Sequence, residues 1–582
     1  MSRRLYWLSW TAIIVFAAVL RLWQLGSDPV SLYWDEAAML VDLKSVTQTG
    51  KDMHGRPWYQ VIYPSYGDYK LPMYIWSASA AVKVFGVSEF AQRLPSALAG
   101  ILTVVMAGYL AKLLLQSGTT TKYAQLFIDQ VQLWTMLIVA IIPWSVMFSR
   151  TGFEGHLGQA LLTTSITLLV WLYQKQKYTL LWLAALPGVA ATYSYFSVRF
   201  VWAVVYVLVL GLLLWQHWQR EQRKKNASSL KGVLRQLGWA VVGVVVFAVL
   251  LLPLLRSPLA KDSDRFRLGT DSVLNNESLV LESNLYRELA GNTIIDRLLY
   301  HRYVLSLREL LKNYSDHLSV SFLFLNGDPN LRHGTGQFGL FLPIFAPAMI
   351  AGWAVLAKRH PLLAAVLFSW WMTALLPASV PENTPHALRS LNALTPLVIV
   401  TGFGSAWIWQ KVVALELGKM QLAVPARALI TLLIMASCIH FWWFYTSVYP
   451  TLSANDWQSG YKPLAQWATS QPEDVQIFID TFDDRWYLWL MAYGPYTPAE
   501  FQSWQSHDYK FQGSNVPNHF GNITFRLPEQ EQLEQLAQSG QKFAVAIRPK
   551  TTLPASELVQ LSCETVIRNE AGQEKFRICT VK

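Results

Sequence analysis

Long apolar runs separated by polar connections dominate the first 446 residues of the chain. A membrane-spanning helix needs roughly 20 mostly apolar residues, and eleven runs approach or reach that length. The pattern therefore predicts a polytopic α-helical membrane protein with about eleven transmembrane helices. The runs lie at residues 6–25, 94–115, 131–149, 157–173, 179–197, 200–216, 236–255, 337–357, 361–378, 391–410 and 424–446.

The charges in the connections predict the orientation of these spans. Arg3 and Arg4 precede the first run, which lacks a small-residue cleavage site and is typical of an anchor rather than a removed signal peptide. Every second connection after it is short and basic, which is typical of cytoplasmic loops. We therefore expect a cytoplasmic N-terminus. The basic residues are Lys112, Lys122, Lys175, Lys177, Arg220, Arg223, Lys224, Lys225, Lys231, Arg235, Lys358, Arg359, Lys411, Lys419 and Arg427.

With this orientation, two long loops lie on the exterior face, at residues 26–93 and 256–336. Residues 72–85 of the first loop are apolar but too short to cross a bilayer, so we expect a helix lying in the membrane interface. The eleven spans and these loops form a predicted membrane domain, residues 1–446.

The remainder of the chain, residues 447–582, is more polar and is predicted to lie outside the membrane as a small soluble α/β domain. Strand-like runs occur at 475–480, 543–548 and 576–581, with helical patterns at 462–470 and 529–539. Cys563 and Cys579 flank a turn predicted near 569–573, so they would face each other in a hairpin. The oxidising exterior compartment permits a disulfide bond between them, and two free thiols are the alternative.

Composition agrees with a membrane protein and excludes several other classes. The chain is 53% hydrophobic and 15% charged, with a mean hydropathy of +0.25, whereas about a quarter of the residues of a soluble domain are charged. The net charge of +11 is explained by the basic loops facing membrane lipids, so we predict no nucleic-acid partner. Three cysteines form no metal-binding CxxC pattern, and Cys438 lies inside a span as a small apolar residue.

Acidic and basic residues gather at the exterior ends of the predicted spans. Asp35 and Glu36 follow the first span in SLYWDEAAML, either as a solvated pair at a helix start or as reacting groups. Glu154 follows the third span, and Arg150 lies one helical turn before it, so a simple i, i+4 ion pair is the alternative to a catalytic role. His156 is interpreted as structural rather than as a metal ligand.

Exterior cations and aromatic residues form a second group of candidates. Lys70 precedes the interfacial helix and Arg389 precedes the tenth span. Both cations would either reach the lipid headgroups or contact an anionic substrate. Tyr193, Tyr195 and Arg199 are candidates for lining a substrate, or for an ordinary aromatic belt.

Six motifs together resemble the polyprenyl-phosphate-sugar-dependent glycosyltransferases of the protein O-mannosyltransferase and aminoarabinose transferase type, which have the type C membrane fold. They are YWDEAAML, GKDMHGR followed by YGDYKLPMYIW, VSEFAQRLPSALAG, FSRTGFEGHL, FLNGDPNLRHGTGQFGL and PHALRSLNALTPL, and they follow the family order over about 400 residues.

The resemblance implies a role for each candidate. Asp35 corresponds to the general base, Glu36 to its neighbour at the acceptor site, and Glu154 to a second exterior acid that is Asp in many relatives. The cations that correspond to donor-phosphate contacts are Lys70 and Arg389, with Arg150 as a further candidate. His54, in GKDMHGR, is a candidate for lining the substrate.

The implied activity is an inverting transfer of a sugar from a polyprenyl phosphate to an acceptor hydroxyl on a protein, lipid or glycan. The sequence contains no GxxxxGK[ST] nucleotide-binding loop, and no cofactor is required. The identity of the sugar, the identity of the acceptor and the use of a divalent metal stay open. A transporter or flippase of lipid-linked glycans is the alternative, although it predicts ionisable residues at the middle of broken spans. A non-catalytic receptor is a further alternative.

Overall fold

In the computed structural model, the described residues are 2–65, 68–116, 121–223, 229–270, 272–413, 416–417, 420–421, 423–480, 485–504, 510–511, 514–515, 519–552 and 561–581. The chain divides into two compact units. Unit 1 comprises residues 1–23 and 96–442, and unit 2 comprises residues 24–95 and 443–582. Residues 26–93, which the sequence analysis predicts as an exterior loop, and the C-terminal region thus belong to the same unit.

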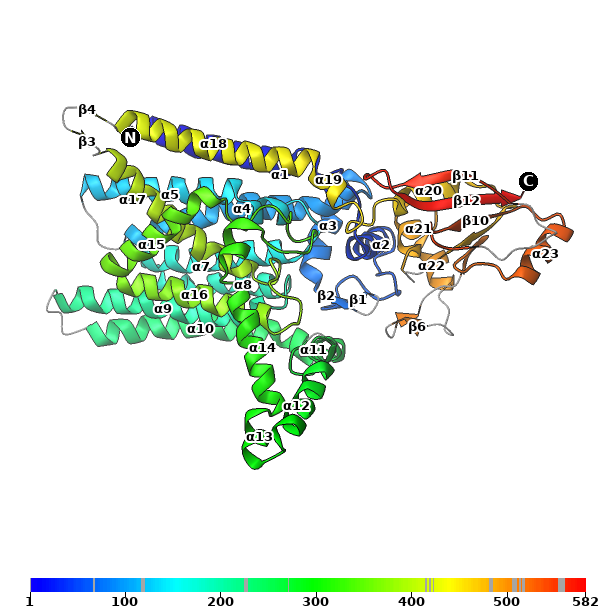
Figure 1. Cartoon of the computed structure of the whole chain (residues 1–582). Coiled ribbons are helices and arrows are strands. Elements are labelled where there is room, and N and C mark those ends of the chain that lie inside the picture. The colour runs from blue at the N-terminus through cyan, green and yellow to red at the C-terminus, as the bar shows by residue number, and fades with distance from the viewer. Residues whose placement is uncertain are drawn as a thin grey trace. The chain divides into compact units, whose positions relative to one another are not determined.

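Nine helices within the described part of the chain are long and apolar enough to cross a membrane, which makes this a multi-pass membrane protein. Helical hydrogen bonding satisfies their backbone polar groups without water, as a bilayer requires. The nine helices appear in Figure 1 as α1 (Arg3–Leu22), α4 (Glu89–Gln116), α5 (Lys122–Ile141), α7 (Gly155–Gln174), α9 (Val198–Arg223), α10 (Ser229–Arg256), α16 (Pro361–Ser379), α17 (Leu394–Val413) and α18 (Ala423–Ser447).

Two of the eleven predicted spans are shorter than the sequence suggested. Residues 179–197 form the 3-10 helix η1 (Tyr178–Ala184) and α8 (Ala185–Thr192). The run at 337–357 becomes helical only at η3 (Pro343–Phe345) and continues as α15 (Ala346–Arg359). A Cβ atom on Gly339 would lie 2.4 Å from the backbone of Phe324, so close backbone packing rather than helix occupies the start of this run.

Unit 1 also contains shorter helices between its long ones. The second long loop is largely helical, and α11 to α14 project from the long helices of the unit (Figure 1). Of the predicted site residues, Arg150 and Glu154 directly precede α7, and Arg389 follows α16. The shorter elements are α6 (Pro143–Phe148), α11 (Pro258–Thr270), α12 (Glu277–Ala290), α13 (Ile294–Leu299), α14 (Arg302–Asp316), the π-helix η2 (Ser321–Leu325), η4 (Leu391–Ala393), β3 (Glu416–Leu417) and β4 (Met420–Gln421).

Unit 2 combines helices from residues 24–95 with a mixed six-stranded sheet. The strand order is β11-β12-β10-β5-β9-β8, with β10, β5 and β9 parallel and the other pairs antiparallel. Its strands and helices confirm the α/β pattern predicted for the C-terminal region. The sheet strands are β5 (Gln476–Ile479), β8 (His519–Phe520), β9 (Ile523–Thr524), β10 (Phe543–Ile547), β11 (Leu561–Arg568) and β12 (Glu574–Val581).

The helices and small hairpins of unit 2 complete its fold. Helix α3 occupies the residues predicted for the interfacial helix. The core of the sheet buries apolar side chains such as Phe478 and Val545 against Leu533 of α23. The elements are α2 (Trp34–Thr49), β1 (Tyr63–Ser65), β2 (Asp68–Lys70), α3 (Pro72–Phe85), α19 (Tyr449–Leu452), α20 (Tyr461–Ser470), α21 (Tyr487–Tyr493), α22 (Pro498–Trp504), β6 (Lys510–Phe511), β7 (Ser514–Asn515) and α23 (Gln530–Gln538).

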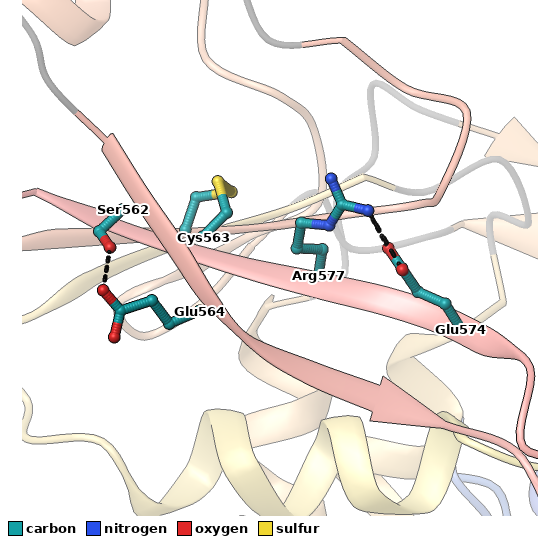
Figure 2. The surroundings of a disulfide bond; sticks show 6 residues. Ser562, Cys563, Glu564, Glu574 and Arg577 are labelled. Atoms are coloured by element: carbon teal, nitrogen blue, oxygen red, sulfur yellow. Dashed lines mark hydrogen bonds and ion pairs between the residues drawn. A yellow bond between two sulfur atoms is a disulfide. The ribbon is translucent and has the colours of Figure 1, made fainter.

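A disulfide bond joins Cys563 of β11 to Cys579 of β12, which is one of the two alternatives that the sequence left open (Figure 2). The two strands form a hairpin whose turn is closed by a hydrogen bond from the Asn569 N–H to the Gln573 carbonyl, at 2.9 Å. The register shifts between Ser562 and Thr565, so Cys563 lies at an irregularity in the ladder opposite Cys579.

Candidate functional site

Asp35 lies in the first turn of α2 and forms an ion pair with Lys70. The helix begins after Tyr33, which has an extended backbone, and its first turn carries Asp35 and Glu36. Acidic side chains at this end stabilise a helix because they interact favourably with the helix dipole. The Lys70 Nζ is 3.3 Å from the Asp35 Oδ1 and 3.1 Å from the Asp68 Oδ2. The Lys70 side chain is buried, whereas about a third of the Asp35 and Asp68 side chains is exposed. Asp35 is thus an accessible carboxylate beside a sheltered cation.

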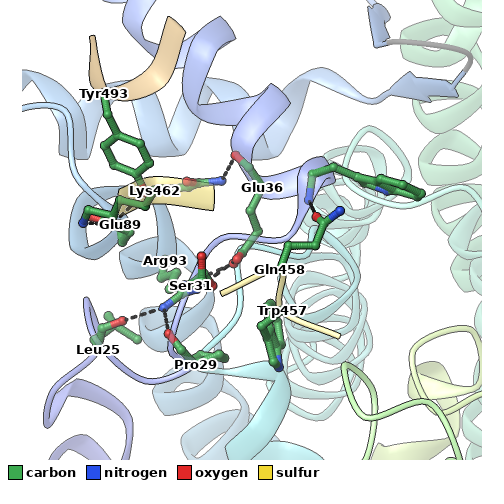
Figure 3. Close-up of polar contacts among 12 residues, drawn as sticks. Leu25, Pro29, Ser31, Glu36, Glu89, Arg93, Trp457, Gln458, Lys462 and Tyr493 are labelled. Atoms are coloured by element: carbon green, nitrogen blue, oxygen red, sulfur yellow. Dashed lines mark hydrogen bonds and ion pairs between the residues drawn. The ribbon is translucent and has the colours of Figure 1, made fainter. Parts of the chain in front are cut away.

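Glu36, the residue after Asp35, is fully buried, and its carboxylate faces Arg93 (Figure 3). The Arg93 guanidinium binds both carboxylate oxygens, Nε to Oε1 at 3.1 Å and Nη2 to Oε2 at 2.9 Å. It also donates to the carbonyls of Pro29 and Ser31, at 2.9 and 2.7 Å. The Gln92 side chain donates to the Glu36 carbonyl at 2.7 Å. Glu36 therefore holds the turn that precedes α2 on α4.

Contacts with the C-terminal part of unit 2 fix α2 at both ends. At the N-terminal end, the Trp34 N–H donates to the Gln458 side chain at 2.8 Å, and the Arg485 guanidinium lies 4.4 Å from the Trp34 ring centroid. Near the C-terminal end, Lys44 donates to the carbonyls of Met491 and Gly494, both at 3.0 Å. The C-terminal domain therefore positions the helix that carries Asp35.

His54 lies in a loop organised by the buried acid Asp52. The Asp52 carboxylate accepts hydrogen bonds from the backbone N–H groups of His54 and Arg56, at 2.9 and 2.7 Å. Burial lowers the pKa of His54, although the charge of Asp52 opposes this shift. Asp42, in α2, is 1% exposed and accepts a hydrogen bond from the Met53 N–H at 3.0 Å.

Glu154 and Arg150 occupy a turn in unit 1 rather than one continuous helix. Helix α6 ends at Phe148, and α7 begins at Gly155 with Glu154 as its N-terminal flanking residue. Arg150 and Glu154 therefore do not lie one turn apart on a single helix, which the ion-pair alternative assumed. Arg150 is fully buried, donates to the Leu20 carbonyl at 3.0 Å and lies 5.4 Å from the Trp442 ring centroid. Glu154 is 9% exposed.

Arg389 lies in the turn before η4, which packs against the start of α7. A Cβ atom on Gly155 would lie 2.6 Å from the Cδ1 atom of Leu388, so the glycine leaves room for this side chain. The Tyr195 side chain also lies against this glycine, 3.7 Å from the same position. Glu154, Tyr195 and Arg389 thus come from neighbouring segments of unit 1.

The remaining predicted lining residues have partners of their own in unit 1. The Tyr193 hydroxyl donates to the Leu250 carbonyl at 3.0 Å. Arg199 forms an ion pair with Asp264 at 3.3 Å, and its guanidinium lies 4.8 Å from the Phe196 ring centroid. The hydrogen bond holds Tyr193 against α10, and the ion pair holds Arg199 against α11.

Several residues of these sites were not singled out from the sequence. Arg93 and Asp68 lie within the motifs VSEFAQRLPSALAG and YGDYKLPMYIW, but only the structure shows that they bind Glu36 and Lys70. In unit 1, Asp328, His333 and His386 offer ligand atoms that all lie within 4.8 Å of one another. They come from two of the six motifs, more than 50 residues apart in the sequence, and no spacing rule links them.

No protein-family model matches the chain, and no curated protein matches it. Among solved structures, the crystal structure of ArnT from Cupriavidus metallidurans in the apo state is 13% identical, with a TM-score of 0.49, and the match covers 98% of this chain and 97% of that one. The form bound to undecaprenyl phosphate matches with 13% identity, a TM-score of 0.46 and 98% of both chains. The archaeal oligosaccharyltransferase AglB from Archaeoglobus fulgidus, in complex with an inhibitory peptide and a dolichol-phosphate, is 12% identical, with a TM-score of 0.42, over 83% of this chain and 63% of that one.

Proposed function

We propose that the protein is a glycosyltransferase that moves a sugar from a polyprenyl phosphate to an acceptor hydroxyl on the exterior face of the membrane. The observation that carries this proposal is the pairing of Asp35 with Lys70 at 3.3 Å. The pair combines the two groups that the reaction requires, a carboxylate that can accept a proton and a cation that can bind a phosphate. The sequence motifs around both residues support the same activity.

In the proposed reaction, Asp35 accepts the proton of the acceptor hydroxyl while the hydroxyl oxygen attacks the anomeric carbon. General-base catalysis by a positioned side chain contributes about 10²- to 10⁴-fold to a rate. A new carbon–oxygen bond forms as the bond between the anomeric carbon and the phosphate oxygen breaks. Because this is a single displacement, the anomeric configuration inverts.

The polyprenyl phosphate leaves with the bonding electron pair, and nearby cations stabilise its charge. Charge-assisted hydrogen bonds from ammonium and guanidinium groups are the strongest contacts for phosphate oxygens. We propose Lys70 for such a contact in unit 2, and the resemblance assigns a phosphate-binding role to Arg389 of unit 1 as well. Arg150 is fully buried and donates a hydrogen bond to the Leu20 carbonyl. We therefore propose that Arg150 positions the turn between α6 and α7 rather than binding the phosphate.

The other predicted residues receive supporting roles in this proposal. Glu36 is a positioning residue, because both its carboxylate oxygens are bound by Arg93. Glu154 is proposed as a second acid that binds substrate hydroxyl groups. Tyr195 is the strongest lining candidate, while Tyr193, Arg199 and His54 are proposed to shape the walls of substrate sites.

The test compares two carboxylates that bind the same ammonium group. Mass spectrometry of exterior proteins and lipids, with and without the protein, identifies the sugar that it transfers. In Asp35→Asn we expect that product to fall at least about 100-fold. In the matched variant Asp68→Asn, whose side chain is equally exposed, we expect a much smaller loss. Normal transfer by a well-folded Asp35→Asn protein would exclude the base, and no mass change on removing the protein would exclude the transferase.

A further inference from the structure

Two segments of unit 1 meet around the carboxylate of Asp328. The loop after η2 turns sharply at Gly327, which has a φ of +73°, and folds back so that a Cβ atom on Gly334 would lie 2.4 Å from the Asp328 carbonyl. The Asp328 Oδ1 accepts a hydrogen bond from the Asn330 N–H at 2.9 Å. This compact turn carries His333 back to the aspartate that begins it.

The second segment, the turn before η4, contributes His386. The Nδ1 atoms of His333 and His386 lie 3.7 and 3.9 Å from the Asp328 Oδ2, and the two imidazole rings have centroids 4.4 Å apart. The His333 Nδ1 is buried and has no hydrogen-bond partner among the described residues. A buried imidazole nitrogen without such a partner, directed at a carboxylate, requires an explanation.

Hydrogen bonds from neighbouring groups hold the aspartate and His386 in place. The Ala387 N–H donates to the Asp328 Oδ2 at 2.7 Å. The His386 N–H donates to the His317 Nε2 at 3.0 Å, and the Trp144 indole N–H donates to the Ala387 carbonyl at 2.9 Å. Such outer contacts are typical of metal ligands, which need a fixed orientation.

We propose that Asp328, His333 and His386 bind one divalent transition-metal ion of the zinc class. Two imidazoles and one carboxylate are a common ligand set for zinc with an open fourth position. Zinc bonds of 2.0–2.2 Å place neighbouring ligand atoms about 3.4 Å apart in a tetrahedral site. The atoms here are within 4.8 Å of one another, so small rotations of the side chains would close the site.

The protonation states of the three groups agree with metal binding. Burial lowers the pKa of His333 to about 3, and it lowers the pKa of His386 as well, so both imidazoles are neutral at pH 7. Burial raises the pKa of Asp328 to about 6, while the charges of Arg332 and Arg389 oppose this shift. Neutral imidazole and ionised carboxylate are the forms that bind metals.

The charges around the site indicate what kind of group would complete the coordination. The positive charges of Arg332 and Arg389 act on Asp328 and both histidines. A divalent ion bound by one carboxylate and two neutral imidazoles keeps a net positive charge. With two guanidinium groups nearby, an anion is favoured over neutral water as the fourth ligand. Only this assignment of the fourth ligand leads back to the proposed phosphate donor; the metal site itself does not depend on it.

Metal content measured on the full-length protein tests the inference without any activity assay. The protein would be purified in detergent with a histidine-free tag, treated with a chelator, incubated with zinc and freed of excess metal. Elemental mass spectrometry should then give about one zinc per chain. His333→Gln and Asp328→Asn should each lose most of this zinc. His519→Gln, which removes an exposed imidazole outside the cluster, should retain it.

A second measurement covers variants that fail to fold. Cobalt(II) added to the chelator-treated wild-type protein should produce the visible absorption of a tetrahedral site, and zinc should displace it. Inorganic phosphate added to the cobalt protein should change that absorption if an anion occupies the fourth position. Wild-type protein with no bound zinc and no cobalt spectrum would overturn the proposal. Equal zinc in well-folded His333→Gln and wild-type protein would also overturn it.

Discussion

Asp35 and Lys70 form an ion pair in which the carboxylate oxygen lies 3.3 Å from the ammonium nitrogen. Asp68 binds the same nitrogen at 3.1 Å, so Lys70 is held between two carboxylates whose side chains are about one third exposed. A cation fixed in this way is already oriented when an anionic substrate arrives, and it needs little reorganisation during the reaction. The pair is thus the part of the molecule in which local structure and proposed chemistry are most directly linked.

Removing this cation should reduce sugar transfer without unfolding the protein. We expect Lys70→Met to lower transfer roughly 100-fold, because one preorganised electrostatic contact to a developing charge contributes about that much. Lys83→Met, which removes an exposed cation of α3, should have little effect. Mass spectrometry of the product measures the rate, and a thermal melt checks folding. Equal loss in both variants would show that Lys70 has no special role.

The buried pair of Glu36 and Arg93 should matter for stability. Breaking a buried ion pair leaves an uncompensated charge and costs about 3–5 kcal/mol. We therefore expect Glu36→Gln to lower the melting temperature strongly. Arg93→Lys should also destabilise, because an ammonium group cannot bind both carboxylate oxygens as the guanidinium does. As a control, Glu309→Gln breaks the exposed pair with Lys312 and should lower the unfolding free energy by less than about 1 kcal/mol. An equally small loss in Glu36→Gln would contradict a structural role for the buried pair.

The membrane helices and the C-terminal α/β pattern could be predicted from the sequence because each depends on local periodicity. The run at 179–197 shows where this approach fails. Its residues are apolar enough to span, yet the structure divides them between η1 and α8. The hydropathy of a segment reports its composition, whereas the length of a helix also depends on the neighbours that pack against it.

The candidate sites show the same division between local and long-range information. Asp35, Lys70 and Arg389 could be named from charge placement and from motifs. The partners of Glu36 could not, because Arg93 follows it by more than 50 residues and pairs with it only through the packing of α2 on α4. The cluster of Asp328, His333 and His386 depends likewise on two turns that meet in space.

The buried acid Asp42 should make stability depend on pH. Burial first, and then the negative charge of Asp52, raise the pKa of Asp42 well above its ordinary value. The contribution of the Asp42 carboxyl to stability is complete below the pKa that this carboxyl has in the unfolded chain, about 3.9. It is lost as the pH rises towards the folded pKa, because only the unfolded chain has released its proton.

Asp42→Asn should therefore raise the melting temperature at pH 7 to 8, and the gain should disappear near pH 4. The amide oxygen keeps the acceptor for the Met53 N–H. Asp474→Asn removes an exposed carboxylate and should change the unfolding free energy by no more than about 0.5 kcal/mol at either pH. Thermal melts across this pH range provide the measurement. A stabilisation by Asp42→Asn that is the same at pH 4 and pH 8 would contradict the assignment.

The disulfide between Cys563 and Cys579 should stabilise the hairpin at the edge of the sheet in unit 2. It closes a loop with a sequence separation of 16 residues, and constraining a loop of that size contributes about 3 kcal/mol. Alkylation of the unfolded, unreduced protein should label one thiol, that of Cys438, and three after reduction. Cys563→Ser should make the C-terminal region more susceptible to proteolysis, whereas Cys438→Ser should not.

The disulfide should also affect activity, because α2 contacts this region through Gln458 and Met491. Loss of the disulfide should therefore reduce sugar transfer more at high temperature than at low temperature. Three reactive thiols without reduction would show that the bond does not form.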